Sequence, residues 1–296
     1  MKFKNLEDKC LYYRGLTDYR IQGNNDIIVM LDGKNFSTLI KNNFKKPFDD
    51  DFINMMNKTA QFLCNNVQGV KFAYVQSDEI SLLITDYDTP ETDTPFGGRI
   101  CKLQSILASL ATSEFNKWFT LNKWYKYCVS ENKFSDDARI SISEVDDFIT
   151  NMKLAQFDCK VWTVPNQNEA FAWFLYRQLD CVKNSKQQTA QTYIPHKQLV
   201  RHNADEQIQM VLEQKGIDWN SFIPDYKFGR FVYKVETTGK AKDNKGNDVE
   251  FTRNKFTVLP ALDLTTDYGR NKFFEHAFEM YAIQPVEDEK LNHFIG

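Results

Sequence analysis

Short apolar segments that end in polar turns constrain this chain most strongly. Residues 27–31 (Ile-Ile-Val-Met-Leu) predict a buried strand, and the turn dipeptide Asp32-Gly33 follows directly. Residues 71–76 and 80–84 predict two more strands, separated only by a short polar turn. A hairpin of these two beside the first strand would place its turn next to Asp32.

That turn carries Ser77, Asp78 and Glu79. If the strands are neighbours, these two carboxylates and Asp32 meet at one edge of a sheet, where they raise one another's pKa unless a divalent cation lies between them. Mg²⁺ prefers oxygen ligands and is often shared with substrate phosphates, and Gly33 could add a backbone carbonyl. Two such ions would activate an attacking oxygen and stabilise a leaving pyrophosphate. Asp-Gly and Ser-Asp are also ordinary turn dipeptides, so spacing alone leaves a metal site and plain turns both open.

The rest of the chain predicts a mixed fold, α/β or α+β, with mostly antiparallel strands. The expected elements are helices after Asp49–Asp51 and from residue 100, a strand over 158–164, helices over 169–184 and 205–215, and a hairpin of 230–235 with 249–259. Apolar periodicity is lost over 132–137. We therefore expect one domain over 1–135 and a second over 136–296.

Composition excludes several classes of protein. Of 296 residues, 42% are hydrophobic and 26% charged, which suits a buried core rather than a disordered chain. No apolar run approaches the roughly 20 residues of a membrane helix, and the N-terminus is charged where a signal peptide is apolar. The six cysteines form no C-x-x-C pair, which favours reduced thiols. A cytoplasmic protein without a membrane partner is expected.

The net charge of −3 means that a phosphate-rich partner must be held by local basic patches. Residues 181–204 contain no acid and four cations: Lys183, Lys186, Lys197 and Arg201. Residues 226–234 interleave aromatics with cations, a pattern of RNA contact or of a packed strand. Arg177, Asp180 and Asn184 share one helix face, which would either face a nucleotide or RNA end or hold a structural Arg–Asp pair.

Three motifs together carry a family resemblance. Asp32-Gly33-Lys34-Asn35-Phe36, Lys46-Pro47-Phe48-Asp49 and Gln76-Ser77-Asp78-Glu79 resemble, in order and spacing, the tRNA(His) guanylyltransferase-like family of 3′–5′ nucleotide-adding enzymes. The likeness extends through Arg99-Ile100-Cys101-Lys102, Phe157-Asp158-Cys159-Lys160 and Arg177-Gln178-Leu179-Asp180 to Lys215-Gly216-Ile217-Asp218-Trp219. It covers most of residues 5 to 235.

The resemblance implies a polymerase-palm-like catalytic domain with a ferredoxin-type antiparallel sheet, flanking helices, and a C-terminal α+β extension that completes the nucleotide and tRNA site. It implies two Mg²⁺ ions, ATP and GTP as substrates, tRNA as partner and a homotetramer. By position, Asp32, Gly33 and Asp78 would bind metal, and Glu79 would be a further acid needed for activity. The implied nucleotide-binding residues are Asp32, Gly33, Lys34, Asn35, Phe36, Ser37, Lys46, Asp49, Ser77, Asp78, Arg99 and Lys102. The candidate tRNA-binding residues are Arg177, Lys183, Asn184, Lys186, Lys197 and Arg201.

The chain also departs from the family pattern. Met30 stands where the family usually has Arg, and Cys159-Lys160 replaces a Gly-Arg pair. Residues 182–188 (Val-Lys-Asn-Ser-Lys-Gln-Gln) replace a His-Ile-Asn-Asn-Leu-Tyr-Asn segment of eukaryotic members that guanylate tRNA(His). The difference at 182–188 favours the branch that repairs 5′-truncated tRNA on a template.

We therefore expect a tRNA nucleotidyltransferase that extends 5′ ends in the 3′–5′ direction after activation by a nucleoside triphosphate. The alternatives are addition of one G to tRNA(His), a palm-type nucleotide cyclase acting on free nucleotides, and a non-catalytic RNA-binding module. RNA-dependent turnover would separate the transferases from the cyclase. Absence of Mg²⁺ binding would favour the binding module.

Overall fold

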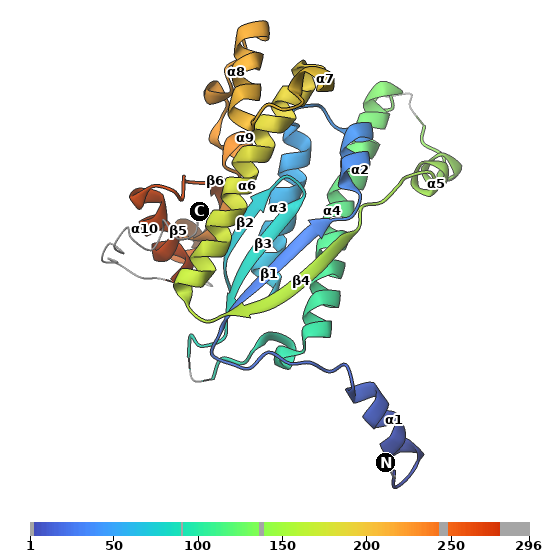
Figure 1. The fold of residues 1–296 in the computed structure, drawn as a ribbon. Coiled ribbons are helices and arrows are strands. Elements are labelled where there is room, and N and C mark those ends of the chain that lie inside the picture. The colour runs from blue at the N-terminus through green and yellow to red at the C-terminus, as the bar shows by residue number, and fades with distance from the viewer. Residues whose placement is uncertain (1–2, 90, 136–138, 243–247, 279–296) are drawn as a thin grey trace.

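The computed structural model describes residues 3–89, 91–135, 139–242 and 248–278. Its centre is an antiparallel sheet of six strands among these residues, in the order β4-β1-β3-β2-β5-β6 (Figure 1). The strands are β1 (Asp26–Gly33), β2 (Val70–Gln76), β3 (Glu79–Thr85), β4 (Phe157–Val164), β5 (Arg230–Lys242) and β6 (Asp248–Pro260). The predicted β2–β3 hairpin and its neighbour β1 are confirmed.

The first four strands form a ferredoxin-like unit with two crossing helices. The chain runs β1, α3 (Asp50–Asn66), β2, β3, α4 (Ile100–Ser130) and β4, and the resulting spatial order is β4-β1-β3-β2. The predicted fold class, a mixed α and β fold with an antiparallel sheet and flanking helices, is confirmed. The hairpin of β5 and β6 extends the sheet at the β2 edge.

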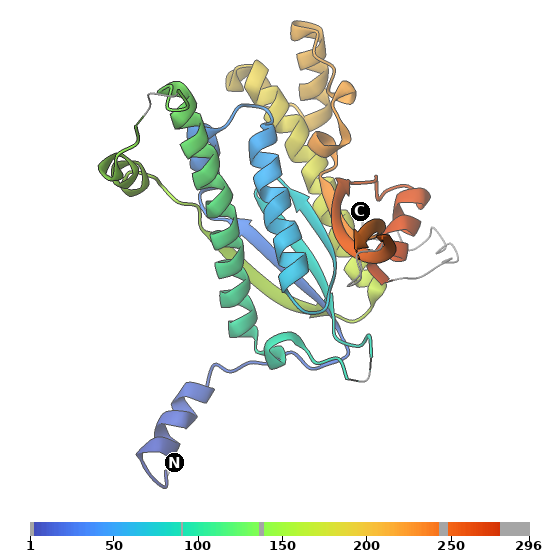
Figure 2. The same cartoon turned by 180° about the vertical axis from the view of Figure 1, so that it is seen from behind.

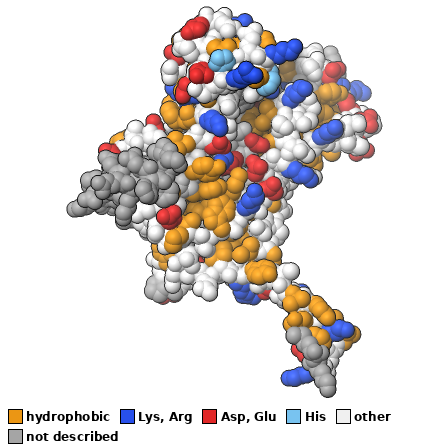
Figure 3. Space-filling view, in the orientation of Figure 1, with side chains coloured by type: hydrophobic (Ala, Val, Ile, Leu, Met, Phe, Trp, Pro, Cys, Tyr) orange, Lys and Arg blue, Asp and Glu red, His pale blue; other side chains and the backbone are white. Residues whose placement is uncertain are grey.

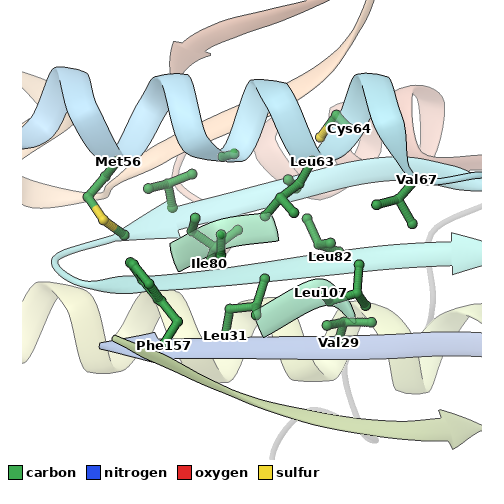
Figure 4. Packing of buried hydrophobic residues seen from close by; sticks show 14 of the residues in the cluster. Val29, Leu31, Met56, Leu63, Cys64, Val67, Ile80, Leu82, Leu107 and Phe157 are labelled. Atoms are coloured by element: carbon green, nitrogen blue, oxygen red, sulfur yellow. The ribbon is translucent and has the colours of Figure 1, made fainter. Parts of the chain in front are cut away.

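The two helices α3 and α4 cover one face of the sheet (Figure 2). Val29 and Leu31 of β1 pack with Met56 and Leu63 of α3 and with Leu107 of α4, and all five are fully buried (Figure 4). The first strand therefore has apolar residues on both faces, since Ile28 is buried in a second cluster on the opposite side.

That opposite face is covered by α6 (Gln167–Tyr193) and α10 (Asp267–Phe278). Phe171 and Phe174 of α6 and Phe273 of α10 pack in one cluster with Phe72 of β2. Phe231 of β5 joins this cluster and is 2% exposed, so packing accounts for the aromatic at this position of the 226–234 stretch. A broad apolar area remains visible on this side of the molecule below a group of acidic side chains (Figure 3).

Helix α6 continues nine residues beyond the predicted end at Asn184. The added turns look polar in sequence, yet Ser185, Thr189 and Ala190 are buried. The Ser185 hydroxyl accepts a hydrogen bond from Trp219 Nε1 at 3.0 Å, which satisfies a polar group that would otherwise be costly to bury. Beyond α6 lie α7 (His196–Leu199), α8 (Ala204–Lys215), η2 (Trp219–Ser221) and α9 (Pro224–Lys227).

The predicted boundary near residue 135 does not divide the sheet, because strands from both sides of it pair directly. Residues 243–247, in the connection of the predicted hairpin of 230–235 with 249–259, lie outside the described residues, as do 136–138 of the boundary segment. The remaining elements are α1 (Leu6–Gly15), which projects from the body in Figure 1, α2 (Phe36–Asn43), η1 (Pro95–Gly98) and α5 (Ile142–Thr150). Within the described part of the chain, no helix combines the length and apolarity needed to cross a bilayer.

Candidate active site

A row of acidic residues crosses the sheet at the end of β1. Asp32 pairs with Glu79 of β3 on one side and with Asp158 of β4 on the other. Directly opposed residues of antiparallel strands point to the same face of the sheet, so the three carboxylates share one face. Asp78 lies in the turn immediately before β3. The structure thus brings Asp32, Asp78 and Glu79 to one edge, as the strand pattern predicted.

The turn after β1 is held against the hairpin turn by main-chain contact. The Gly33 N–H donates to the Asp78 carbonyl at 3.1 Å, and the Lys34 N–H donates to the Gln156 carbonyl at 2.8 Å. A Cβ at residue 33 would lie only 2.3 Å from the Phe36 ring, so this position requires glycine for packing. The two turns therefore have a fixed relation to one another before any ligand is present.

Glu79 is the most constrained of the acids. Its side chain is 5% exposed and accepts hydrogen bonds from Arg177 Nε at 2.7 Å and Arg177 Nη2 at 2.5 Å. Arg177 also donates to Asp180 at 3.1 Å, and Asn184 donates to the same Asp180 oxygen. The structural Arg–Asp pair considered for this helix face is present. Arg177 uses its Nε and Nη2 for these bonds, which hold Glu79 in place.

Burial and mutual repulsion raise the pKa of each acid. Burial is the main cause for Asp32, and the charge of Asp158 adds to it. Burial raises the pKa of Asp78 to about 6, with a smaller contribution from Asp32, while a hydrogen bond with Ser77 opposes the shift. Burial also raises the pKa of Glu79, although Arg177 acts in the opposite direction. The nearby donors and cations therefore do not fully offset the cost of ionising these carboxylates in a buried position.

Because ionised Asp78 is destabilised in the folded protein, we expect Asp78→Asn to increase stability in a pH-dependent way. The folded-state pKa of Asp78 lies above its ordinary value of 3.8, so wild-type stability falls as the pH rises from about 4 through about 6. In chelator at pH 8 the variant should be more stable by about 2 kcal/mol, and at pH 4 the difference should vanish. Urea unfolding at both pH values measures this. An equal effect at both pH values would contradict the assignment.

The donor set of this edge suits a hard divalent cation. Among the described residues, no three His, Cys, Asp or Glu side chains are already arranged around a common metal position. Asp32 and Asp78 nevertheless supply two carboxylates that burial and repulsion destabilise as free anions. Mg²⁺ commonly uses only one or two protein carboxylates and keeps water or phosphate oxygens as its other ligands. The residues present therefore fit Mg²⁺.

A cavity of about 410 Å³ opens beside these acids. Asp32, Ser77, Asp78 and Glu79 form one wall, and the second half of α6 forms another. Its further wall includes aromatic residues of the segment 44–52 and of α9, among them Phe48, which stacks on Tyr226 at 4.5 Å between ring centroids. This size is within the range of small-molecule sites, and the lining combines apolar rings with convergent polar groups.

The segment 45–49 lines the cavity through Lys45, Pro47, Phe48 and Asp49. Asp49 caps α3 by accepting the Phe52 N–H at 3.1 Å, and its second oxygen accepts the Lys45 N–H at 2.8 Å. Both carboxylate oxygens are thus engaged with backbone. Lys46 is exposed and is not part of the lining.

The segment 34–37 lies in the turn after Asp32 and at the start of α2, outside the cavity lining. Phe36 is 1% exposed and packs on Phe115 and Phe157, so its side chain belongs to the core. Lys34 and Ser37 are exposed. Asn35 adopts a left-handed backbone conformation with φ of 58°. Asn35 is exposed too, so any nucleotide contact by this segment would come from its backbone or from the side chains of Lys34, Asn35 and Ser37.

Arg99 and Lys102 lie at the opposite end of the sheet from Asp32. Arg99 Nε donates to Asp18 at 2.6 Å, and its neighbour Ile100 donates its N–H to the Tyr19 carbonyl, just before β1 begins. Six strand residues separate that end from Asp32, roughly 20 Å at about 3.3 Å per residue. A single chain does not bring these two cations to the cavity, and their role in nucleotide binding stays a prediction.

Lys183 and Lys186 lie on α6, Lys197 lies on α7, and Arg201 follows α7, which is near the top of the view in Figure 1. Lys183, Lys197 and Arg201 are exposed. Lys186 instead forms an ion pair with Asp205 at 2.5 Å and lies over the Trp219 ring. Three cations of this stretch are thus presented to solvent, one of them on the helix that also lines the cavity.

Two features of the site were not assigned from sequence. Asp158 faces Asp32 because β4 pairs with β1, and Lys160 lies two residues further along the same strand. The charge of Lys160 lowers the pKa of Asp32, opposite to the effect of Asp158. The strand prediction over 158–164 contained both residues, but only the pairing of β4 with β1 reveals their contact with the site. Arg230 of β5 also lines the cavity.

Comparison with known proteins agrees with this geometry. The family model of tRNAHis guanylyltransferase matches residues 9–165. A bacterial tRNA(His) guanylyltransferase-like protein solved in complex with ATP superposes with a TM-score of 0.72 at 26% identity, covering 93% of this chain and 99% of that chain. A structure of such a bacterial protein in complex with GTP has a TM-score of 0.64 at 25% identity, with 92% and 99% covered.

Sequence relatives point the same way. An uncharacterized protein of Acanthamoeba polyphaga mimivirus, R259, is 27% identical over 96% of this chain and 94% of its own length. The tRNA(His) guanylyltransferase 2 of Arabidopsis thaliana is 25% identical over 74% of this chain, which corresponds to 38% of that longer protein. The enzymes of this family are nucleotidyltransferases. Since the family model matches more than half of its residues, this chain belongs to the tRNA(His) guanylyltransferase family.

Proposed function

We propose that this chain is an ATP- and Mg²⁺-dependent nucleotidyltransferase that adds nucleotides to the 5′ end of tRNA in the 3′–5′ direction and repairs 5′-truncated tRNA on a template. One observation carries the proposal. Asp32 at the end of β1 and Asp78 in the turn before β3 converge on the wall of a cavity of about 410 Å³ in a chain of this family. A bacterial relative was solved in complex with ATP, which supports a nucleoside triphosphate as the ligand.

The side chains of this edge would divide the work. Asp32, Asp78 and the Gly33 carbonyl would hold Mg²⁺, which supplies stabilisation of negative charge on phosphate oxygens when bound. Arg177 fixes Glu79 beside Asp32 by its two hydrogen bonds and opposes the rise in the pKa of Glu79 that burial causes. The fixed contact between Gly33 and Asp78 preorganises the two turns, so less reorganisation is needed during reaction.

The proposed reaction has two stages. A 5′-monophosphate oxygen of the tRNA attacks the α-phosphorus of ATP, forming a 5′–5′ anhydride and releasing pyrophosphate. The 3′-hydroxyl of an incoming nucleotide then attacks the activated 5′ phosphorus, loses its proton and displaces AMP. Both stages are displacements at phosphorus, so one set of carboxylates and cavity residues can serve both.

The amide side chains that α6 contributes to the cavity wall favour template-directed repair over addition of one G. Asn184, Gln187 and Gln188 line the cavity within residues 182–188, the segment that differs from the tRNA(His)-guanylating enzymes. Side-chain amides both donate and accept hydrogen bonds, so this wall could accept more than one base.

The decisive assay combines the purified chain, Mg²⁺, ATP and labelled nucleotides with 5′-monophosphorylated tRNA lacking its first nucleotide. Full-length tRNA(His) serves as the parallel substrate. Restoration of the missing base opposite its template partner supports repair. A single G added only to tRNA(His) would replace repair by that reaction, and nucleotide turnover without RNA would favour a cyclase. Silence together with absence of Mg²⁺ binding would favour a non-catalytic RNA-binding module.

Exposed cations of α6 and α7 should contribute to tRNA affinity. Lys183→Ala with Lys197→Ala removes two exposed charges, one on each of these helices. We expect weaker tRNA binding at low salt and a decrease of about 1 to 2 in the slope of log affinity against log salt concentration. Fluorescence anisotropy over a salt series measures both quantities.

A matched control for that variant is Lys240→Ala. Lys240 is also exposed, but it lies on the β5–β6 hairpin and faces Glu250 at 3.6 Å. Its removal should leave the slope unchanged. An equal loss in both variants would mean that the effect is one of net charge and that 181–204 is not a specific RNA surface.

A further inference from the structure

Arg230 is a buried cation at the wall of the cavity. It is 3% exposed and is the first residue of β5. Its Nε donates to the Asn57 side-chain oxygen at 2.9 Å, and its Nη1 lies 3.5 Å from the Asp225 carbonyl, at the limit of a hydrogen bond. Its Nη2 has no hydrogen-bond partner among the residues that the structure describes. The acceptors that it does have are neutral groups.

This state is energetically unfavourable in an unliganded protein. A guanidinium remains charged at neutral pH even though burial lowers the pKa of Arg230. Among the described residues no carboxylate forms an ion pair with Arg230, although the charge of Asp225 acts on it from a greater distance and raises its pKa. A buried guanidinium with an unused donor and only this distant compensation carries a desolvation cost. Arg177, in the same cavity, shows the usual solution, because its guanidinium is bound by the Glu79 and Asp180 carboxylates.

The local backbone fixes where Arg230 lies. Gly229 has a φ of +80°, and a Cβ there would lie 2.6 Å from the Val75 carbonyl, so only glycine allows this close approach to β2. The Tyr74 hydroxyl donates to the neighbouring Phe228 carbonyl at 2.8 Å. Arg230 then pairs with Val75, three residues before Asp78. The cation is therefore held by rigid strands rather than by a loop.

We propose that Arg230 is a substrate-binding residue whose guanidinium donates hydrogen bonds to a phosphate oxygen of the ligand in this cavity. A guanidinium only donates, and an incompletely compensated positive charge is best matched by an anionic acceptor. The phosphate belongs either to the nucleoside triphosphate or to the 5′-monophosphate of the RNA. Because Nη2 is covered in the unliganded structure, side chains of the wall must shift slightly on binding. The proposal rests on the proposed function and adds to it the cation that receives the phosphate.

Arg230→Met tests the proposal, because it keeps an unbranched apolar stem and removes the guanidinium with its charge. We expect affinity for ATP, or for a 5′-monophosphorylated RNA hairpin, to fall about 10- to 100-fold. Affinity for adenosine and for the same hairpin with a 5′-hydroxyl should not change. The melting temperature of the unliganded variant should be equal to or higher than that of the wild type. Arg230→Lys keeps the charge but lacks the paired N–H donors of the guanidinium. Its affinity for the phosphate ligand should therefore fall less than that of Arg230→Met.

Titration calorimetry with each ligand identifies which phosphate is bound, and Lys234→Met is the matched control. Lys234 lies on the same strand and is exposed, so its removal should leave both affinities unchanged. A lower melting temperature with unchanged affinities would overturn the proposal and make Arg230 structural. An equal loss for adenosine would overturn it in favour of a base contact. If the wild type binds neither ATP nor the phosphorylated hairpin, the proposed function fails together with it.

Discussion

Asp32→Asn should lower nucleotide addition at the tRNA 5′ end by at least about 10³-fold, with both stages affected, because it removes a carboxylate that would hold Mg²⁺, whose stabilisation of charge on phosphate oxygens is worth several kcal/mol. Asp78→Asn should have the same effect. The fold should remain intact, since both side chains lie at the cavity edge and not in the core. Single-turnover assays that follow adenylylated tRNA and extended tRNA separately measure the two stages.

Asp158→Asn provides the matched control for this loss. It removes one carboxylate directly opposite Asp32 in the same sheet row, but from an exposed position on β4. Its charge raises the pKa of Asp32, so its removal should change activity by less than about 10-fold. Retained addition by Asp32→Asn, in protein verified free of wild type, would exclude Asp32 as a metal ligand.

Arg177→Met should be the most destabilising single change at this site, with a loss of about 3–5 kcal/mol in the free energy of unfolding. The variant leaves the buried Glu79 carboxylate without its cation. Burial already raises the pKa of Glu79, and loss of Arg177 raises it further. A carboxyl with a raised folded-state pKa destabilises the protein increasingly as the pH rises, so the deficit should be larger at pH 8 than at pH 5. Urea unfolding at both pH values measures it.

The double variant Arg177→Met with Glu79→Gln separates the two partners. Removal of both charges should recover most of the stability, because no buried ion remains unpaired. It should not recover activity. If the double variant is as unstable as Arg177→Met alone, the loss comes from the contacts of the guanidinium with the Trp173 and Tyr176 rings and not from its ion pair with Glu79.

The ferredoxin-like unit could be predicted from sequence because its signals are local. The run 27–31, the hairpin around residues 77 and 78 and the helix after Asp49 each carry their own periodicity or turn chemistry. The convergence of Asp32 and Asp78 follows from strand adjacency, which apolar runs of this kind indicate well. The end of α6 could not be predicted, since its polar turns are buried only through contacts such as that of Ser185 with Trp219.

Which side chains contact one another within the site could not be predicted from the sequence. Arg177 and Glu79 are 98 residues apart, and their contact depends on how α6 crosses the sheet. Arg99 carries a family motif, yet the sheet places it near the start of β1, where Asp18 binds it. Arg230 looked like one cation of an aromatic strand, and only its burial and its unused donor distinguish it from Lys234. Side-chain partners that are distant in sequence are therefore the part that sequence patterns miss.

The strand order β4-β1-β3-β2-β5-β6 also determines when the catalytic edge can exist during synthesis. When the ribosome has added only the first 135 residues, β1 and β2 both present open backbone edges, because their outer neighbours β4 and β5 come later. Unpaired strand edges recruit other chains, so the nascent segment should be prone to aggregation until residue 164 closes one side and residue 235 the other. Catalytic activity therefore requires that most of the polypeptide has been made. A prematurely terminated chain would be an aggregation-prone fragment without activity.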